Sequence, residues 1–323
     1  MSDPRPLPPF LAAFTAPAFR ALWAGAFLSS IGTWTQDVAL NWLIHERYGD
    51  PFYLGLRQFA AEAPLLAFMA VGGAVADRID RRRILLTSQV VQMSLATALG
   101  VLYATDRLEM GGIVVIAFMT GLAQSQSAPT YQAVLTSIVP PAQIPNAVAL
   151  NSLQFNLSRF LGPAIAAFLL AAVGTGPCFF VNALSFLGVI AALWTLKIPL
   201  AAPGGGGKTL GQSLKDGFHH MTGDPVLSRL TLIALFGSFL AFPLLTFLPV
   251  IADLRLGAGA AGYSALLSAF GLGAIAGALT TAHRGKVEGR GRLLLLAFVA
   301  HGLLATGALA SRTRPLTMAL LFA

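Results

Sequence analysis

Long uncharged and apolar stretches alternate with short polar segments along almost the whole chain. Six of the stretches contain no Asp, Glu, Lys or Arg: Ile84–Thr105, Met110–Ser158, Pro177–Leu196, Leu230–Ala252, Leu256–Ala282 and Leu293–Ser311. Each can form at least one helix of about 20 residues, the length that crosses roughly 30 Å of hydrocarbon. The pattern predicts transmembrane helices at 20–43, 53–76, 84–105, 110–136, 147–173, 177–197, 229–252, 261–283 and 293–311, with a tenth that begins near Pro315.

The composition agrees with a surface that faces lipid. Hydrophobic residues make up 56% of the chain and charged residues only 11%, whereas soluble domains contain about 25% charged residues. A protein surrounded by lipid has an apolar surface and restricts charge to loops and interior sites. These features exclude an ordinary soluble domain and predict an all-α integral membrane protein.

A long polar interruption divides the predicted helices into two groups. It spans residues 199–228, contains four consecutive glycines at 204–207, and has the composition of a flexible linker. It separates a six-helix bundle at 1–198 from a partial bundle at 229–323, which holds three helices and the start of a fourth. Because only nine residues, Pro315–Ala323, follow the start of that fourth helix, we expect the second bundle to be incomplete here.

The positive charges indicate the orientation of the helices. The formal net charge is +8, a value compatible with nucleic-acid binding, but the positions of the charges indicate topology instead. Fourteen of the 21 Lys and Arg residues lie in segments on the same side as the N-terminus, six, Arg57 among them, lie on the other side, and Arg159 lies within a span. The positive-inside rule then predicts a multi-pass protein of the cell membrane with a cytoplasmic N-terminus and no nucleic-acid partner.

A charged motif follows the second predicted helix. The segment Gly73-Ala-Val-Ala-Asp77-Arg78-Ile-Asp80-Arg81-Arg82-Arg83 resembles the loop between the second and third helices of the major facilitator superfamily. The resemblance implies that the glycine permits close helix approach and that the acidic and basic residues form a network that biases conformational switching. Asp80 replaces a second glycine, so the turn geometry is expected to differ. The alternative interpretation is an ordinary arginine-rich cytoplasmic loop.

Further stretches are similar to the branch of this superfamily that contains enterobactin-type exporters. They are Phe19–Gly25, Gly32–Leu40, Asn151–Ala164 and Phe180–Phe186. The resemblance implies two six-helix bundles and efflux of siderophores, drugs or other amphipathic metabolites, driven by an ion gradient. Gly162-Pro163 resembles a helix-packing motif of the fifth helix of antiporters and slightly favours antiport. The arginine that many proton-coupled drug exporters carry in the fourth helix is missing, since Met110–Ser158 is uncharged.

Ionisable side chains inside predicted spans are candidates for substrate binding or coupling, because charge is unfavourable in hydrocarbon. The candidates, with three neighbouring residues, are Asp37, Arg159, Gln36, Trp34, Asn156 and Glu62. A carboxylate in a water-filled cavity can bind and release a proton as access alternates, and we expect Asp37 and Arg159 to lie in or near that cavity. The alternatives are a fixed ion pair and, for Glu62, a place at the outer interface.

Several amides also lie within the predicted spans. Gln124, Gln126, Asn151, Gln154 and Asn182 either line a cavity or form hydrogen bonds between neighbouring helices. The sequence leaves both possibilities open.

These patterns predict a secondary transporter rather than an enzyme. No cluster of His, Ser or carboxylate residues suggests catalysis, and Cys178 is the single cysteine, so we expect no catalytic residues, metal site or cofactor. The expected partners are a small-molecule substrate, a coupling ion and membrane lipid, with a monomeric protein. We expect the ion to be a proton, and the sequence leaves sodium open as the alternative. The alternative function is a membrane scaffold or ligand sensor that does not transport.

Overall fold

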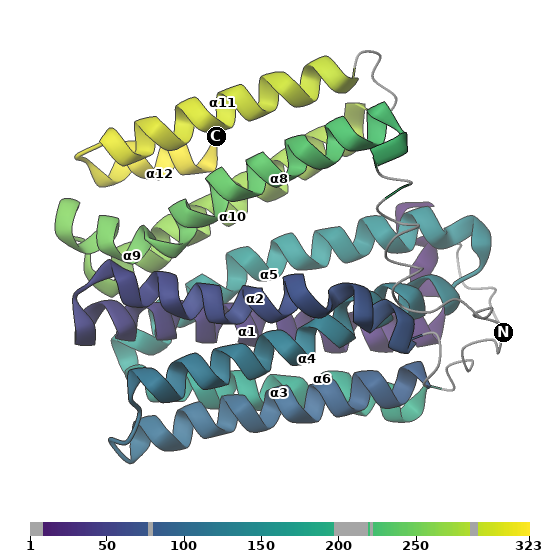
Figure 1. The fold of residues 1–323 in the computed structure, drawn as a ribbon, viewed down its shortest axis with the longest axis horizontal. Helices are drawn as coiled ribbons and strands as arrows, with labels where there is room; N and C mark the ends of the chain where they lie inside the picture. Colours follow the sequence, from purple (N-terminus) through teal and green to yellow (C-terminus); the bar gives the residue numbers. More distant parts are fainter. Residues whose placement is uncertain (1–8, 77–79, 197–218, 220–221, 285–289) are drawn as a thin grey trace, which may run out of the picture.

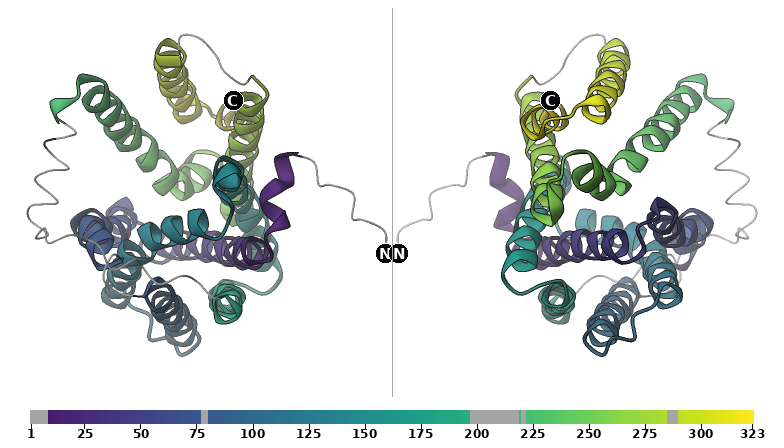
Figure 2. Two further views of the ribbon diagram at one scale, coloured as in Figure 1. Left: turned by 90° about the vertical axis from the view of Figure 1, so that its right-hand side faces the viewer. Right: turned by 90° about the vertical axis from the view of Figure 1, so that its left-hand side faces the viewer.

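The helices of this protein form two groups that lie side by side. The structure is a computed structural model that describes residues 9–76, 80–196, 219, 222–284 and 290–323. Helices α1 to α6 form the first group, and α8 to α12 form the second (Figure 1). Figure 2 shows the same division along the helix axes, with the second group covering one side of the first. The part of the chain that the structure describes contains no strand, as predicted for an all-α membrane protein.

The first group is a bundle of six long helices. They are α1 (Pro17–Tyr48), α2 (Pro51–Ala76), α3 (Arg81–Ala104), α4 (Met110–Ser137), α5 (Ile144–Ala172) and α6 (Gly176–Thr195). Two short 3-10 helices, η1 (Pro9–Thr15) and η2 (Pro141–Gln143), precede α1 and α5. Proline at the first or second position of α1, α5 and α6 fits the missing N–H of a helix start. Gly49 ends α1 with a φ of 68°, a left-handed conformation that glycine adopts without strain.

The second group is shorter and less regular. It contains α8 (Pro225–Thr246), α9 (Leu248–Val250), α10 (Gly259–Arg284), α11 (Arg290–Ala310) and α12 (Arg314–Phe322). A π-helical turn, η3 (Ile251–Arg255), continues from α9. The predicted helix at 229–252 is therefore wrong in its limits. The observed helix begins at Pro225, and the carboxylate of the preceding Asp224 accepts a hydrogen bond from the backbone N–H of Val226 (2.8 Å), as an N-cap does.

Four of the described helices are both long and apolar enough to cross a membrane on length and composition alone. They are Arg81–Ala104, Pro141–Ala172, Gly176–Thr195 and Gly259–Thr280. Helices α1, α2 and α4 also have the length to cross a membrane, with 32, 26 and 28 residues. Charged and amide side chains in α1, and the amides and hydroxyls between Gln124 and Gln132 in α4, lower the mean hydropathy of these two helices. Helices with this composition are expected where a bundle encloses a polar interior.

Helix α1 is central to the first bundle, and glycines allow its close approach to two neighbours. It packs on α5 and α6, while α2 packs on α4 and α3 packs on both α4 and α6. A Cβ at Gly25 would lie 2.7 Å from the carbonyl oxygen of Gly188 in α6. A Cβ at Gly162 in α5 would clash with Trp34 and lie 3.0 Å from the carbonyl oxygen of Ile31. Small residues at these crossings let the helix backbones come together.

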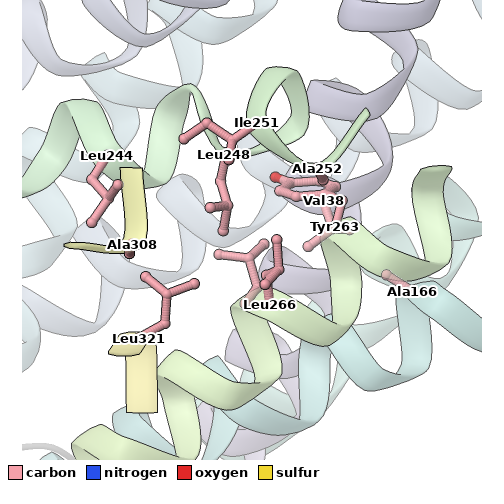
Figure 3. Close-up of a cluster of buried hydrophobic side chains, with 11 residues drawn as sticks. Val38, Ala166, Leu244, Leu248, Ile251, Ala252, Tyr263, Leu266, Ala308 and Leu321 are labelled. Atoms are coloured by element: carbon pink, nitrogen blue, oxygen red, sulfur yellow. The ribbon is translucent and has the colours of Figure 1, made fainter. Parts of the chain in front are cut away.

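A shared hydrophobic core joins the two groups of helices. Val38 of α1 and Ala166 of α5 pack with Leu248, Ala252 and Tyr263 of the second group (Figure 3). Helix α5 also packs along α10, where a Cβ at Gly271 would come within 2.8 Å of the Cα atom of Phe160. Gly271 is therefore a helix-packing position. The two groups are in close contact around α1, α5 and α10.

The charged motif after α2 is only partly described. Gly73 lies in α2, whereas Asp77 and Arg78 lie outside the described residues, so the expected charge network cannot be traced through them. Asp80 is the N-cap of α3, and its side chain accepts a hydrogen bond from the backbone N–H of Arg82 (2.9 Å). The glycine position of the motif therefore holds a helix-capping residue here.

The basic run begins α3 and reaches the end of α6. Arg81, Arg82 and Arg83 occupy the first turn of α3. The guanidinium of Arg82 donates a hydrogen bond to the carbonyl oxygen of Trp194 (2.8 Å), in the last turn of α6. A cation at that position interacts favourably with the partial negative charge of the helix C-terminus. Most of the predicted linker, residues 197–218 and 220–221, lies outside the described part of the chain.

Candidate functional site

The first bundle contains a polar cavity of about 490 Å³. Its wall comes from five helices and consists of Ala26, Ser29, Ser30, Thr33, Trp34, Leu85, Gln89, Gln92, Gln124, Ser127, Ala128, Tyr131, Gln132, Asn151, Ser152, Gln154, Phe155, Asn156, Phe186 and Val189. We call this space the polar cavity. It is lined mainly by amides, hydroxyls and aromatic rings, and none of the lining side chains carries a formal charge.

Some of the polar side chains in this wall are fixed by hydrogen bonds between helices. The amide of Gln154 in α5 donates to the hydroxyl of Ser30 (2.8 Å) and to the carbonyl oxygen of Ala26 (3.2 Å), both in α1. Within α5, the amide of Asn156 donates to the carbonyl oxygen of Ser152 (2.8 Å). These bonds hold one wall of the cavity in place.

Other polar atoms of the wall have no partner among the described residues. The side-chain oxygen of Gln89 and the hydroxyl of Tyr131 are both buried without a hydrogen bond. An unsatisfied buried polar group costs about 1 to 3 kcal/mol. A bound molecule with matching donors and acceptors would recover this free energy, so the polar cavity has the chemistry of a binding site.

A second, smaller space lies beside the first. This charged cavity has a volume of about 110 Å³ and is lined by Thr33, Gln36, Asp37, Leu40, Arg57, Gln58, Ala61, Glu62, Gln92, Ala96, Leu99, Ile116, Ala117, Thr120, Gly121, Gln124, Asn182 and Phe186. It shares Thr33, Gln92, Gln124 and Phe186 with the polar cavity. The two spaces therefore adjoin at these four residues.

A charged network links α1 and α2 in this second space. Arg57 donates hydrogen bonds to a carboxylate oxygen of Asp37, with which it forms an ion pair, and to the side-chain oxygen of Gln58 (3.2 Å). The amide of Gln58 in turn donates to Glu62 (3.1 Å), one helical turn further along α2. The Arg57 side chain is 11% exposed and that of Asp37 31%. The network places two carboxylates around a single guanidinium.

Amide hydrogen bonds complete the wall around Asp37. The Asn182 amide of α6 donates to the side-chain oxygen of Gln36 (2.9 Å). The hydroxyl of Thr33 donates to the side-chain oxygen of Asn182 at 3.4 Å and to the carbonyl oxygen of Ser29 at 3.0 Å. Asn182 and Gln36 thus connect α1 to α6 beside the ion pair.

Arg159 lies among aromatic rings rather than carboxylates. Its guanidinium carbon is 5.1 Å from the ring centroid of Trp34, 5.2 Å from that of Phe155 and 5.4 Å from that of Phe270. Its Nε atom is buried and has no hydrogen-bond partner in the described structure. Each cation–π contact contributes about 0.5 to 2 kcal/mol. Because Phe270 belongs to α10, these contacts also join the two groups of helices.

The sequence-based candidates divide between the two cavities. Trp34 and Asn156 line the polar cavity, and Gln36, Asp37 and Glu62 line the charged one. Arg159 lines neither, but it contacts Trp34 and Phe155 in the wall of the polar cavity. Gly162 and Pro163 are buried in α5, where Gly162 accepts a hydrogen bond from the hydroxyl of Thr35 (3.1 Å).

The assignment of Arg57 to an outer loop was wrong. Helix α2 begins at Pro51, six residues before Arg57, and the side chain turns inward to Asp37. The predicted helix at 53–76 already contained Arg57, so counting it with the charges of the outer loops conflicted with that prediction. Sequence reasoning also missed Gln58, whose spacing of four residues from Glu62 places the two on one helix face. Gln89, Gln92, Tyr131 and Gln132 gave no pattern that distinguishes cavity residues from other polar residues in spans.

The five amides within the predicted spans were expected either to line a cavity or to form hydrogen bonds between helices. Both occur. Gln124 and Asn151 line the polar cavity, Gln154 lines it while bonding to α1, and Asn182 bonds to Gln36 in the charged cavity wall. Gln126 lines neither cavity. The described residues contain no group of three or more His, Cys, Asp or Glu side chains that could bind a metal ion.

Comparison with known proteins places this architecture in a family. A model described as a transmembrane secretion effector matches residues 9–323. The staphyloferrin A transporter of Staphylococcus aureus is 28% identical over 177 residues, which cover 54% of this chain and 44% of that protein. The enterobactin exporter EntS of Shigella boydii is 27% identical over 298 residues, 90% of this chain and 70% of that protein.

The macrolide efflux protein A of Streptococcus pyogenes is more distant. It is 22% identical over 151 residues, which cover 47% of this chain and 37% of that protein. The matches thus span less than half the length of several of the curated relatives, as with the staphyloferrin A transporter at 44%.

Solved structures have the same fold at lower sequence identity. A bacterial homologue of the human lysosomal transporter Spinster has a TM-score of 0.66 and 16% identity over 96% of this chain and 70% of its own. The human organic anion transporter MFSD10 has a TM-score of 0.55 and 15% identity over 94% of this chain and 82% of its own. Together with the match over residues 9–323, this shows that the chain belongs to the transmembrane secretion effector family of the major facilitator superfamily.

Proposed function

We propose that this protein exports small amphipathic molecules, such as siderophores, drugs or metabolites, across the cell membrane by alternating access. The observation that carries the proposal is the polar cavity. Its amides and hydroxyls can form hydrogen bonds with a substrate, and Trp34, Tyr131, Phe155 and Phe186 offer apolar ring surface beside them. The functions named for its relatives, export of enterobactin and efflux of macrolides, support the same class of substrate.

A proton gradient is the proposed driving force. The charged cavity supports this, because carboxylates beside a water-filled path can bind and release protons, and Asp37 and Glu62 line that space. Arg159, surrounded by Trp34, Phe155 and Phe270, is proposed to contact substrate or to respond to its binding. Gly73, Asp77 and the basic run at 81–83 are proposed to stabilise one of the two access states.

We propose that the protein is a monomer surrounded by lipid, with its N-terminus in the cytoplasm. The excess of Lys and Arg on the N-terminal side of the predicted spans supports this orientation. In this orientation the contact between Val38 and Leu248 lies toward the outside, because α1 starts on the cytoplasmic side and ends on the other. The two bundles would then separate at this end to release substrate.

Efflux from intact cells tests the proposal. Cells that express this chain and, separately, a version lengthened to twelve helices are loaded with a radiolabelled siderophore or macrolide, and its loss is followed with and without a proton uncoupler. We expect uncoupler-sensitive efflux. Gln124→Leu should lower the initial rate about tenfold, which corresponds to about 1.4 kcal/mol. Gln126→Leu is the matched control, since Gln126 lies in the same helix but lines neither cavity.

Two results would contradict the proposal. Equal efflux rates for the Gln124→Leu and Gln126→Leu variants would exclude the polar cavity as the substrate site. Binding of a labelled siderophore or macrolide to the inserted protein without any flux, in either version, would favour a scaffold or ligand sensor instead.

A further inference from the structure

The two carboxylates of the charged cavity have different partners. Asp37 forms an ion pair with Arg57. Among the described residues, Glu62 accepts one hydrogen bond, from the amide of Gln58 to its Oε1 atom (3.1 Å). An ion pair favours the ionised form of a carboxylate, whereas a neutral amide that donates to one oxygen leaves the second oxygen open to a proton. The geometry therefore distinguishes the two acidic residues, although both line the same space.

The charge balance of the cavity points in the same direction. With both carboxylates ionised, Asp37, Arg57 and Glu62 give a net charge of −1, and a single bound proton makes the cavity neutral. The lining residues from α3, α4 and α6 include no titratable side chain: Gln92, Ala96, Leu99, Ile116, Ala117, Thr120, Gly121, Gln124, Asn182 and Phe186. No second cation in this wall compensates Glu62.

Two further ionisable groups belong to helices that approach α2 or its ion pair. Tyr263 of α10 is close enough to interact electrostatically with Asp37 and Arg57, but a phenol is uncharged at physiological pH. Arg229, the charged residue of α8, is exposed near the start of that helix and does not line the cavity. Neither group supplies a countercharge to Glu62 within the cavity.

We propose that Glu62 is the residue that binds and releases the coupling proton, while Asp37 stays ionised as the partner of Arg57. This inference rests on the proposed proton-driven export. In the step itself, a proton from water bonds to a carboxylate oxygen of Glu62 and forms the neutral acid. When access alternates, the same O–H bond breaks and the proton returns to water on the other side. No other bond changes, and Arg57 keeps its proton throughout.

The position of Glu62 also explains how the proton and the substrate could act on each other. Gln92 and Gln124 line both cavities. Neutralising Glu62 removes a negative charge from the cavity that shares these amides with the space for substrate. Protonation at Glu62 therefore changes the electrostatic field at the substrate site.

Infrared spectroscopy of the purified chain in detergent tests the proposal without any substrate. Lowering the pH should produce the carbonyl stretch of a protonated carboxylic acid in a protected site. We expect this band to be lost in Glu62→Gln, to persist in Asp37→Asn, and to return in Glu62→Asp at a shifted frequency. Glu46→Gln is the control, since Glu46 is an exposed carboxylate further along α1 that lines neither cavity. Circular dichroism shows whether each variant is folded.

The outcomes separate this inference from the export proposal. Loss of the band in Asp37→Asn with retention in Glu62→Gln would overturn the assignment to Glu62, whatever the flux measurements show. If Glu62→Gln fails to fold, the other two variants still decide. Loss of the band in Asp37→Asn contradicts the inference. A band that persists in Asp37→Asn and shifts in frequency in Glu62→Asp supports the inference. If the infrared band shows that Glu62 binds and releases a proton but the chain moves no substrate, the result would contradict the export proposal and not the assignment to Glu62.

Discussion

The imidazole of His45 and the carboxylate of Asp253 meet across the two groups of helices, with 3.0 Å between Nε2 and Oδ2. His45 lies near the end of α1, and Asp253 lies in the π-helical turn η3. Trp42, one turn before His45, stacks on Tyr263 of α10 with ring centroids 6.4 Å apart. This polar contact therefore lies beside the shared hydrophobic core of Figure 3. It marks the end of the protein at which the two groups are joined.

Removing this contact should shift the protein toward a state in which that end is open. The His45 side chain is 5% exposed but that of Asp253 is 42% exposed, so we expect an effect of about 0.5 to 1 kcal/mol for Asp253→Asn. This corresponds to a change of about two- to five-fold in the population of the open state. The measurement is the rate of maleimide labelling of a cysteine at Val38, in a chain with Cys178→Ala, before and after the Asp253 change.

The control for this experiment is Glu46→Gln, which alters an exposed charge next to His45. An equal increase in labelling for Glu46→Gln and Asp253→Asn would show that local charge, rather than the contact across the two groups, controls access to Val38.

The Asp37–Arg57 pair should make a large contribution to folding. Arg57→Gln leaves Asp37 without its countercharge in a mostly buried site, and we expect a loss of stability of about 2 kcal/mol. The combined change Arg57→Gln and Asp37→Asn removes both charges and should be more stable than Arg57→Gln alone. Thermal unfolding of the purified variants measures the difference. A double variant that is less stable than either single variant would contradict an ion pair between these two residues.

We expect the charge of Arg159 to lower the stability of the folded protein and to be needed for transport. Its guanidinium contacts three rings but no carboxylate in the described structure. Arg159→Met keeps much of the side-chain volume and removes a charge that has no carboxylate partner in the described structure. Because the desolvation cost of that charge offsets its cation–π contacts, we expect the unfolding temperature to rise or stay unchanged. Under the proposed function, efflux should fall about tenfold or more, a change of about 1.4 kcal/mol.

Arg20→Met is the matched control for the Arg159 variant, because Arg20 is an exposed arginine near the start of α1. It should leave the efflux rate within about twofold of the unchanged protein, which is about 0.4 kcal/mol. Unchanged efflux in Arg159→Met, with the same protein level in the membrane, would exclude a role for Arg159 in transport.

The membrane fold could be predicted because hydrophobic length and charge spacing act locally along the chain. The site depended on contacts that one sequence does not reveal. Asp37 and Glu62 were identified because charges within spans are rare, but the partner of Asp37 is Arg57, 20 residues away in the next helix. The ring of Phe270 reaches Arg159 from the second group of helices. Such pairings depend on how α1, α2, α5 and α10 rotate against one another, and helix rotation is a property of tertiary packing.

Close contact between α5 and α10 gives a last prediction that does not depend on the substrate. A Cβ at Gly271 would lie 2.8 Å from the Cα and N atoms of Phe160, whereas a Cβ at Gly277 in the same helix would meet nothing within 4 Å. Gly271→Val should therefore force the helices apart and destabilise this arrangement by about 1 to 3 kcal/mol. Thermal unfolding in detergent measures the loss. Gly277→Val introduces the same side chain into the same helix without the clash, so an equal loss in both variants would mean that helix propensity, rather than the approach of α5 and α10, explains the effect.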